Sequence, residues 1–146
     1  MNILAIDPGI TGGYVFNNKD KLFVYKFTTM DEVELRILGN NIEKVYIEKV
    51  HSSPQMGVKS AFTFGDNFGA WNEFIRGSLV ANKVLVPPQV WQKTYPHLQG
   101  IQGNPRKKML KLLAEESHPD IKLTLATCDA ILIHDYAQRI EDNKNG

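Results

Sequence analysis

The stretch that decides the fold is NILAIDPG, residues 2–9. It begins with an almost unbroken apolar run of strand length, which Pro8 and Gly9 bring to an end. A strand without alternating polar residues is typical of the middle of a sheet, where both faces are covered. We therefore expect residues 2–7 to form a central strand that carries Asp7 at its carboxyl end.

The rest of the chain supplies further elements for such a sheet. Two β-rich runs, 12–16 and 22–27, flank a turn-forming cluster at 17–20, which predicts an antiparallel meander with the first strand. The later elements that we expect are a helix at 30–38, a strand at 44–48, a helix at 58–76 closed by Gly77, a strand at 83–86, a short helix at 88–91, a basic helix at 105–116 and a last helix from Thr124 to about residue 140. This order predicts an α/β fold with a five-stranded mixed sheet flanked by helices, in one domain over residues 1–146.

Composition excludes several classes of protein. Of the 146 residues, 42% are hydrophobic, which is enough to build a core. Cys128 is the single cysteine, so we expect neither an intramolecular disulfide nor a cysteine-based zinc site. No apolar run approaches the roughly 18 residues of a membrane helix, and the N-terminus does not resemble a signal peptide. We expect a cytoplasmic protein without a membrane partner.

Charge is unevenly distributed, although the net charge is only +1. The segment 74–114 contains no Asp or Glu, whereas acidic residues gather at 31–48 and after 115. Such a segment predicts a positive surface suited to a phosphate backbone. Its basic residues are Arg76, Lys83, Lys93, Arg106, Lys107, Lys108 and Lys111.

Two acids end apolar strands. Glu48 closes the run KVYIE in the same way that Asp7 closes the first strand. If the two strands are parallel neighbours, their carboxylates lie side by side at one edge of the sheet. Two buried acids repel each other and raise each other's pKa unless a divalent cation lies between them.

A third acid, Asp129, falls on the apolar face of the last predicted helix. Helical spacing places it on one stripe with Leu125, Leu132, Ile133 and Tyr136. By the same spacing His134 points away from this stripe, which argues against it as a ligand. Asp135 lies on a different face, where we expect a solvated charge.

Asp7, Glu48 and Asp129 together form an oxygen-only ligand set that suits Mg²⁺, with Mn²⁺ as a substitute, rather than zinc. Two such ions roughly 4 Å apart can activate water and stabilise the leaving oxygen in phosphodiester hydrolysis. The pattern therefore predicts metal-assisted hydrolysis.

The predicted helix at 58–76 has a stripe of small residues, Ala61, Gly65 and Gly69. One interpretation is close packing against the domain's own sheet, and the other is a symmetric helix-to-helix contact in a dimer. For Phe62 and Phe64 we expect a place in the core.

Five segments resemble the RuvC-type Holliday-junction resolvases, in particular their small phage branch. They cover about half the chain, and the second is the most specific. They are NILAIDPGITGG (2–13), VYIEKVHSSPQMGVKSAFTFGDNFGAW (45–71), VPPQVWQK (86–93), PRKKMLKLLAEESHP (105–119) and CDAILIHDYA (128–137).

The resemblance implies a ribonuclease H-like fold and a Mg²⁺-dependent endonuclease. It implies a homodimer, for which we expect contact through the 58–76 helix, that cuts opposed strands of a four-way DNA junction and acts in recombination or phage DNA processing. Asp7, Glu48 and Asp129 match the metal-binding catalytic acids of the family. A lysine of the basic helix, Lys107 or Lys108, matches the lysine near the scissile phosphate; of the two, we name Lys107 as the catalytic candidate.

The sequence departs from the family at one position of the metal site. The family usually carries a second acid about one turn before the last-helix aspartate, and here Leu125 and Ala126 occupy that turn. This predicts weaker magnesium dependence or relaxed substrate selectivity.

DNA contacts are expected from the loop after Glu48 and from the basic segment. Met56 is placed to wedge against an exposed base, and Lys59 to contact phosphate. The candidate DNA-binding residues are His51, Met56, Lys59, Lys93, Arg106, Lys108 and Lys111.

Other functions are open at this point. IDPGITGGYV also resembles the first phosphate loop of ASKHA-type phosphotransferases, but that architecture needs two lobes. A YqgF-like RNA nuclease is a second alternative, although the later motifs of that branch do not appear. A module that binds branched DNA without cutting it is a third alternative, which the missing fourth acid supports.

Overall fold

The computed structural model describes residues 1–50, 56–79 and 81–145. The chain forms five strands and five α-helices with one short 3-10 helix within these residues. In chain order they are β1 (Ile3–Asp7), β2 (Gly13–Asn18), β3 (Lys21–Lys26), α1 (Met30–Ile37), β4 (Lys44–Glu48), α2 (Val58–Ser78), β5 (Asn82–Val86), α3 (Pro88–Gln92), η1 (Pro96–Leu98), α4 (Gly103–Ser117) and α5 (Leu125–Asn145).

The strands form one mixed sheet in the order β3-β2-β1-β4-β5. β1 lies at its centre, antiparallel to β2 and parallel to β4, and β5 continues parallel to β4. The predicted five-stranded mixed sheet is therefore confirmed, and so is the central position of the strand that ends at Asp7. Each predicted strand is found within one or two residues of its expected bounds.

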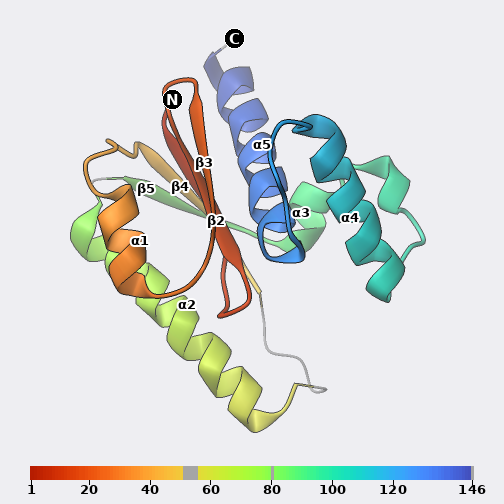
Figure 1. The fold of residues 1–146 in the computed structure, drawn as a ribbon, viewed down its shortest axis with the longest axis horizontal. Helices are drawn as coiled ribbons and strands as arrows, with labels where there is room; N and C mark the ends of the chain where they lie inside the picture. Colours follow the sequence, from red (N-terminus) through yellow and green to blue (C-terminus); the bar gives the residue numbers. More distant parts are fainter. Residues whose placement is uncertain (51–55, 80, 146) are drawn as a thin grey trace.

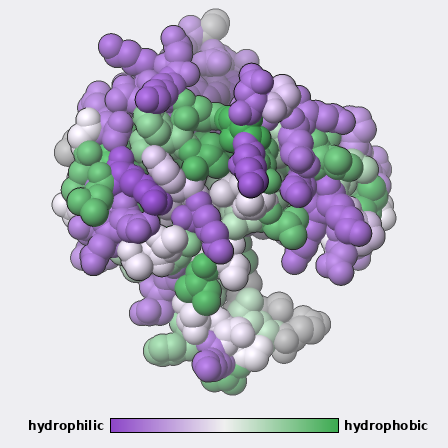
Figure 2. Space-filling view, in the orientation of Figure 1, coloured by the Kyte–Doolittle hydropathy of each residue, from purple (hydrophilic) through white to green (hydrophobic). Residues whose placement is uncertain are grey.

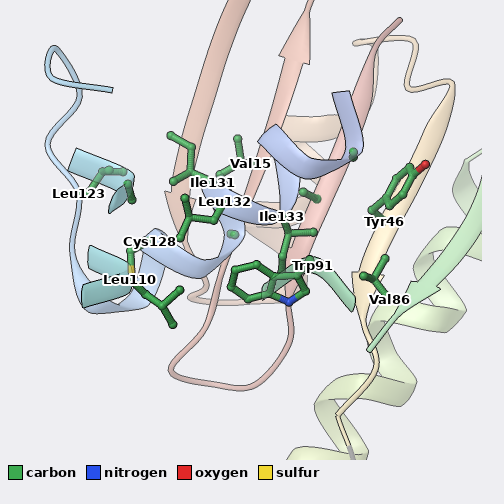
Figure 3. Close-up of a cluster of buried hydrophobic side chains, with 14 of the residues drawn as sticks. Val15, Tyr46, Val86, Trp91, Leu110, Leu123, Cys128, Ile131, Leu132 and Ile133 are labelled. Atoms are coloured by element: carbon green, nitrogen blue, oxygen red, sulfur yellow. The ribbon is translucent and has the colours of Figure 1, made fainter. Parts of the chain in front are cut away.

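Helices cover both faces of the sheet (Figure 1). α1 and α2 pack on one face, and α5 packs on the other with α3 and α4 beyond it. Side chains alternate along β1, so Leu4 and Ile6 enter the α1–α2 core, whereas Ile3 and Ala5 enter the α5 core. Figure 3 shows the α5 core, in which Ile131, Leu132 and Ile133 of α5 meet side chains of the sheet and of α3.

Several helix ends differ from the prediction: α4 begins at Gly103, two residues before the predicted start, and the ends of α2 and α5 also differ. α2 does not stop at Gly77 but runs to Ser78. The backbone first adopts an extended conformation at Leu79, whose N–H still donates to the Ile75 carbonyl. α5 does not stop near residue 140 but continues to Asn145. Glu141 explains the extension, since it is buried and accepts a hydrogen bond from the Tyr46 hydroxyl at 2.6 Å.

The start of α5 is the predicted one. The Thr124 carbonyl accepts hydrogen bonds from the amides of Thr127 and Cys128. In return, the Thr127 hydroxyl accepts the Thr124 N–H at 3.0 Å, as in a capping box. Within the described residues, no helix is both long and apolar enough to span a membrane.

Candidate functional site

Asp7 and Glu48 end neighbouring parallel strands on the same face of the sheet. The register pairs Ile6 with Ile47, so Asp7 and Glu48 follow as the next pair. Because side chains alternate along a strand, Asp7 has the orientation of Ile3 and Ala5, and Glu48 has that of Tyr46. Those residues belong to the core under α5, so both carboxylates point toward that helix.

Asp129 approaches from α5, whose first turn lies unusually close to β2. A Cβ atom on Gly13 would lie 2.5 Å from the Ala126 carbonyl oxygen, so only glycine permits this approach. A Cβ atom on Gly12 would lie 2.0 Å from the Asp7 carbonyl oxygen. Gly12 and Gly13 thus let α5 and the turn after β1 bring Asp129 and Asp7 together.

Asp7 and Asp129 line one cavity of about 260 Å³, which we call the acid cavity. Lys107 of α4 lines it as well. The other lining residues are Thr11, Leu125, Ala126 and Cys128. Glu48 is not among them, but its carboxylate lies close enough for its charge to act on Asp7.

The three carboxylates lie in an environment that disfavours negative charge. Burial is the largest cause and raises the pKa of Asp7 well above its ordinary value, with repulsion from Asp129 and Glu48 adding to the effect. Burial also raises the pKa of Glu48 to about 7, although a hydrogen bond from Trp91 opposes the shift. For Asp129, burial raises the pKa, while a contact with the Cys128 thiol and the positive charge of Lys107 lower it. Uncompensated acids at this depth are what a bound divalent cation would stabilise.

The donor set fits a hard cation. Asp7, Glu48 and Asp129 offer carboxylate oxygens, and burial raises the pKa of the Cys128 thiol to about 12, so that Cys128 stays a weak ligand. In the part of the chain that the structure describes, no three His, Cys, Asp or Glu side chains stand at the spacing of a formed metal site. The three acids are nevertheless close enough for their charges to act on one another.

Two side chains that hold the site were not assigned a role from the sequence. The Trp91 indole donates a hydrogen bond to Oε2 of Glu48 at 2.7 Å. The buried side chain of Asn67 in α2 accepts the N–H of Gly9 at 2.8 Å and so fixes the turn after Asp7. The only signal for Trp91 was its place in the motif VPPQVWQK, and nothing marked Asn67 beyond a polar residue in an apolar helix.

The basic segment 74–114 is divided between the two faces of the sheet, since Lys83 bonds Asn72 of α2, whereas α3 and α4 pack in the α5 core. Its residues line three separate cavities. Arg76 and Lys83 line a cavity at the end of α2, Lys93 and Arg106 line a groove between α3 and α4, and Lys107 lines the acid cavity. The chain crosses the sheet between Lys83 and Lys93, which separates these groups.

Arg106 has a structural role that differs from the expected DNA contact. Its guanidinium donates to Oε1 of Gln92 at 3.0 Å and to the carbonyl oxygens of Leu98 and Ile101, both at 2.8 Å. These bonds connect α3, η1 and the start of α4. The groove beside Arg106 has a volume of about 630 Å³, and its lining among the described residues includes Tyr95 and Lys93 and no acidic residue.

The other expected DNA-binding residues differ in solvent exposure. Lys93 and Lys108 are exposed, Lys111 is half-buried, and Lys59 is exposed beside the half-buried Met56 at the start of α2. His51 lies outside the described residues.

The small-residue stripe of α2 does not pack against the sheet. Gly65 and Gly69 are exposed, and a Cβ atom on either would meet no atom of the described residues within 4 Å. Phe62 is 78% exposed, so its expected place in the core is wrong, whereas the half-buried Phe64 stacks on Phe68. The N-terminal end of α2 projects from the body of the protein and carries hydrophobic surface (Figure 2).

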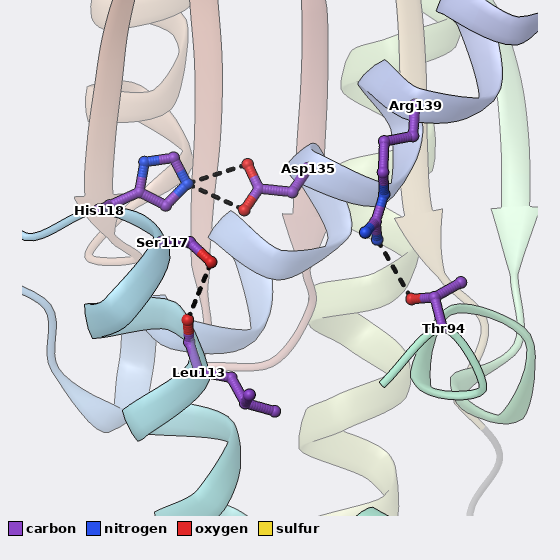
Figure 4. A network of polar contacts seen from close by, with 6 residues as sticks. All are labelled: Thr94, Leu113, Ser117, His118, Asp135 and Arg139. Atoms are coloured by element: carbon purple, nitrogen blue, oxygen red, sulfur yellow. Dashed lines mark hydrogen bonds and ion pairs between the residues drawn. The ribbon is translucent and has the colours of Figure 1, made fainter. Parts of the chain in front are cut away.

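Other α5 residues also differ from expectation. Leu125 is 61% exposed and does not belong to the apolar stripe. Asp135 is not a solvated charge but meets Nε2 of His118 at 2.9 Å with both carboxylate oxygens, which ties the end of α4 to α5 (Figure 4). His134 is buried and bonds Oδ1 of Asn17 of β2 at 2.9 Å.

Solved structures resemble the chain over nearly its whole length. One is Thermus thermophilus RuvC in complex with a Holliday junction substrate, which matches with a TM-score of 0.58 and 17% identity and covers 96% of each chain. A second, T. thermophilus RuvC by itself, matches with a TM-score of 0.57 and 18% identity over 97% of each chain. The chain has a RuvC-type fold.

The RuvC-type fold confirms the ribonuclease H-like α/β architecture expected from the five motifs. No protein-family model matches the sequence, and no curated protein matches it. The phage branch therefore stays a prediction. Leu125 and Ala126 line the acid cavity. They stand one turn before Asp129, where RuvC-type resolvases usually carry a further acid.

Proposed function

We propose that the protein is a divalent-metal-dependent endonuclease that resolves four-way DNA junctions and cuts other branched DNA. The observation that carries the proposal is the convergence of Asp7, Glu48 and Asp129, with Lys107 beside them, in a RuvC-type fold. A solved relative of this fold holds a Holliday junction substrate.

The acids would hold Mg²⁺, or Mn²⁺ in its place, which supplies an activated water and stabilises the leaving oxygen when bound. Lys107 would contact the scissile phosphate, because its ammonium lines the cavity from the side of α4. The groove lined by Lys93 and Tyr95 would contact the DNA backbone and bases next to the cleavage point. Lys59, Lys108 and Lys111 would contribute phosphate contacts farther from the metals.

A homodimer would cut the two opposed strands of a junction, since each protomer supplies one set of acids. The exposed face of α2, with Phe62, Gly65 and Gly69, is the surface proposed for the dimer contact. Glycines on that face would let a second copy of the helix approach closely.

The deciding experiment is cleavage of a labelled synthetic four-way junction beside a linear duplex of the same arms, with Mg²⁺, with Mn²⁺ and with chelator. We expect paired, metal-dependent nicks near the branch point of the junction and no cleavage of the duplex. Asp7→Asn and Glu48→Gln should abolish cleavage and keep junction binding. A junction that is bound but stays uncut with either metal would replace the proposal by a DNA-binding module, and cleavage of structured RNA alone would favour the YqgF-like alternative.

A further inference from the structure

A buried hydrogen bond joins Trp91 to Glu48. Nε1 of Trp91 donates to Oε2 of Glu48 at 2.7 Å. Trp91 is fully buried and Glu48 is 6% exposed, so water does not compete for the bond. Among the described residues, no second donor reaches the Glu48 carboxylate.

The fold gives the indole one fixed direction. β5 lies beside β4 and pairs Val86 with Glu48, and the chain then enters α3 through Pro87 and Pro88. One turn later, Trp91 lies back over the end of β4. Its ring packs in the α5 core (Figure 3). It also makes an edge contact with Tyr95, with ring centroids 6.4 Å apart. A ring held by packing on several sides is a rigid donor.

The Glu48 side chain needs such a donor because the other acids repel it. Asp129 disfavours the negative charge of Glu48, and Glu48 in turn disfavours that of Asp7. A glutamate has three side-chain torsions, so without a partner its carboxylate would rotate away from the other two. The Trp91 bond opposes this rotation.

We infer that Trp91 is a positioning residue whose indole N–H holds the Glu48 carboxylate ready to bind the metal together with Asp7 and Asp129. This inference rests on the proposed function. Carboxylates that bind metals are commonly oriented by hydrogen bonds of their own, and loss of such a partner weakens metal binding on the order of 10–100-fold.

The chain contains a matched control, because its second tryptophan is also fully buried. Trp71 packs in the opposite core against Tyr14 and Phe27, and its Nε1 has no hydrogen-bond partner among the described residues. Trp91→Phe and Trp71→Phe therefore remove the same atoms from a fully buried site. Only Trp91→Phe removes a bond to Glu48.

The test measures metal binding without DNA. Mn²⁺ binding is followed by the paramagnetic resonance signal of the free ion, for the wild type and both variants, with circular dichroism to verify folding. In ¹⁵N-labelled wild type, each indole N–H gives one signal, assigned by the two variants. We expect Mg²⁺ to shift the Trp91 signal and not the Trp71 signal. We also expect the Mn²⁺ dissociation constant of Trp91→Phe to rise by roughly tenfold or more, and that of Trp71→Phe to stay within about twofold of wild type.

Each other outcome overturns the inference in a distinguishable way. If folded Trp91→Phe binds Mn²⁺ as tightly as wild type, Trp91 does not position Glu48 and the proposed function stands. If both variants lose affinity equally, the loss comes from weakened packing rather than from the indole N–H. If the wild type binds no Mn²⁺, the proposed metal-dependent function fails together with the inference.

Discussion

Lys107 and Asp129 line the same cavity from two neighbouring helices, α4 and α5, and the positive charge of Lys107 opposes the rise in pKa that burial causes at the Asp129 carboxyl. Both Lys107 and Lys108 are exposed, but Lys108 does not line that cavity. The sequence left the choice between the two lysines open, and this relationship favours Lys107 as the residue beside the reacting phosphate.

Lys107→Ala is expected to lower the cleavage rate of a four-way junction by roughly 100-fold, because a cation that stabilises developing phosphate charge is lost. Lys108→Ala should change the rate by less than about threefold at the same ionic strength, since a surface phosphate contact acts mainly on binding. Single-turnover cleavage with saturating enzyme separates the two effects. Equal losses in both variants would argue against a special role for Lys107.

In the metal-free protein, the contribution of Glu48 to stability should fall as pH rises from about 4.5 to 7. Burial raises the pKa of Glu48 from 4.5 to about 7, so the folded state favours the protonated acid. The stabilisation that Glu48 contributes is complete below its pKa in the unfolded state. It is lost as pH rises through its pKa in the folded state. In chelator at pH 8, Glu48→Gln should therefore raise the Tm by on the order of 5 °C.

Calorimetry at pH 4.5 and pH 8 checks this prediction. The gain from Glu48→Gln should shrink at pH 4.5, where the wild-type acid is also neutral. Saturating Mg²⁺ at pH 8 should stabilise the wild type more than the variant. A Tm difference that is independent of pH would show that Glu48 is not the titrating group.

An acid introduced at the start of α5 should strengthen the proposed metal binding. Leu125 lines the acid cavity yet is 61% exposed, so replacing it removes little core packing, and a carboxylate is favourable in the first turn of a helix. Leu125→Asp is expected to lower the Mg²⁺ concentration for half-maximal cleavage several-fold. Leu125→Asn is the control of nearly equal size, and a similar gain from it would rule out the added charge as the cause.

Arg106 should matter for stability more than for DNA binding. Arg106→Lys keeps the charge but cannot reach Gln92, Leu98 and Ile101 together, so it should cost about 2 kcal/mol of unfolding free energy. Lys93→Ala, in the same groove, should leave stability unchanged and weaken junction binding. Urea unfolding and a binding titration measure both effects. Full stability of Arg106→Lys with weakened binding would return Arg106 to the DNA-contacting residues.

The exposed end of α2 should govern the oligomeric state. Phe62→Asp is expected to convert a dimer to a monomer in analytical ultracentrifugation, because a charge would be buried against the partner helix. Leu35→Asp is the control, since Leu35 of α1 is 83% exposed on another helix. A wild type that is already monomeric at micromolar concentration would contradict the dimer proposal.

Much of the fold was predictable because apolar periodicity and turn residues act locally. The run 2–7, the strand 44–48 and the glycine and proline breaks around them predicted the sheet, the central place of β1 and the strand-end positions of Asp7 and Glu48. The errors fall where local signals compete with distant contacts. Gly77 resembled a helix end but stays in α2, and α5 extends past residue 140 because Tyr46 and Lys44 bond Glu141.

By itself, the sequence determined which residue types end the central strands and which acid stands on the last helix, because strand and helix periods fix the direction of each side chain. Only the tertiary structure decided which groups meet. It brought Lys107 rather than Lys108 to the acids, turned Trp91 onto Glu48, directed Arg106 to backbone carbonyls and left Phe62 outside the core. These outcomes depend on how separate helices and strands pack against one another. The spacing of residues along one helix or strand does not determine the distance between side chains of different elements.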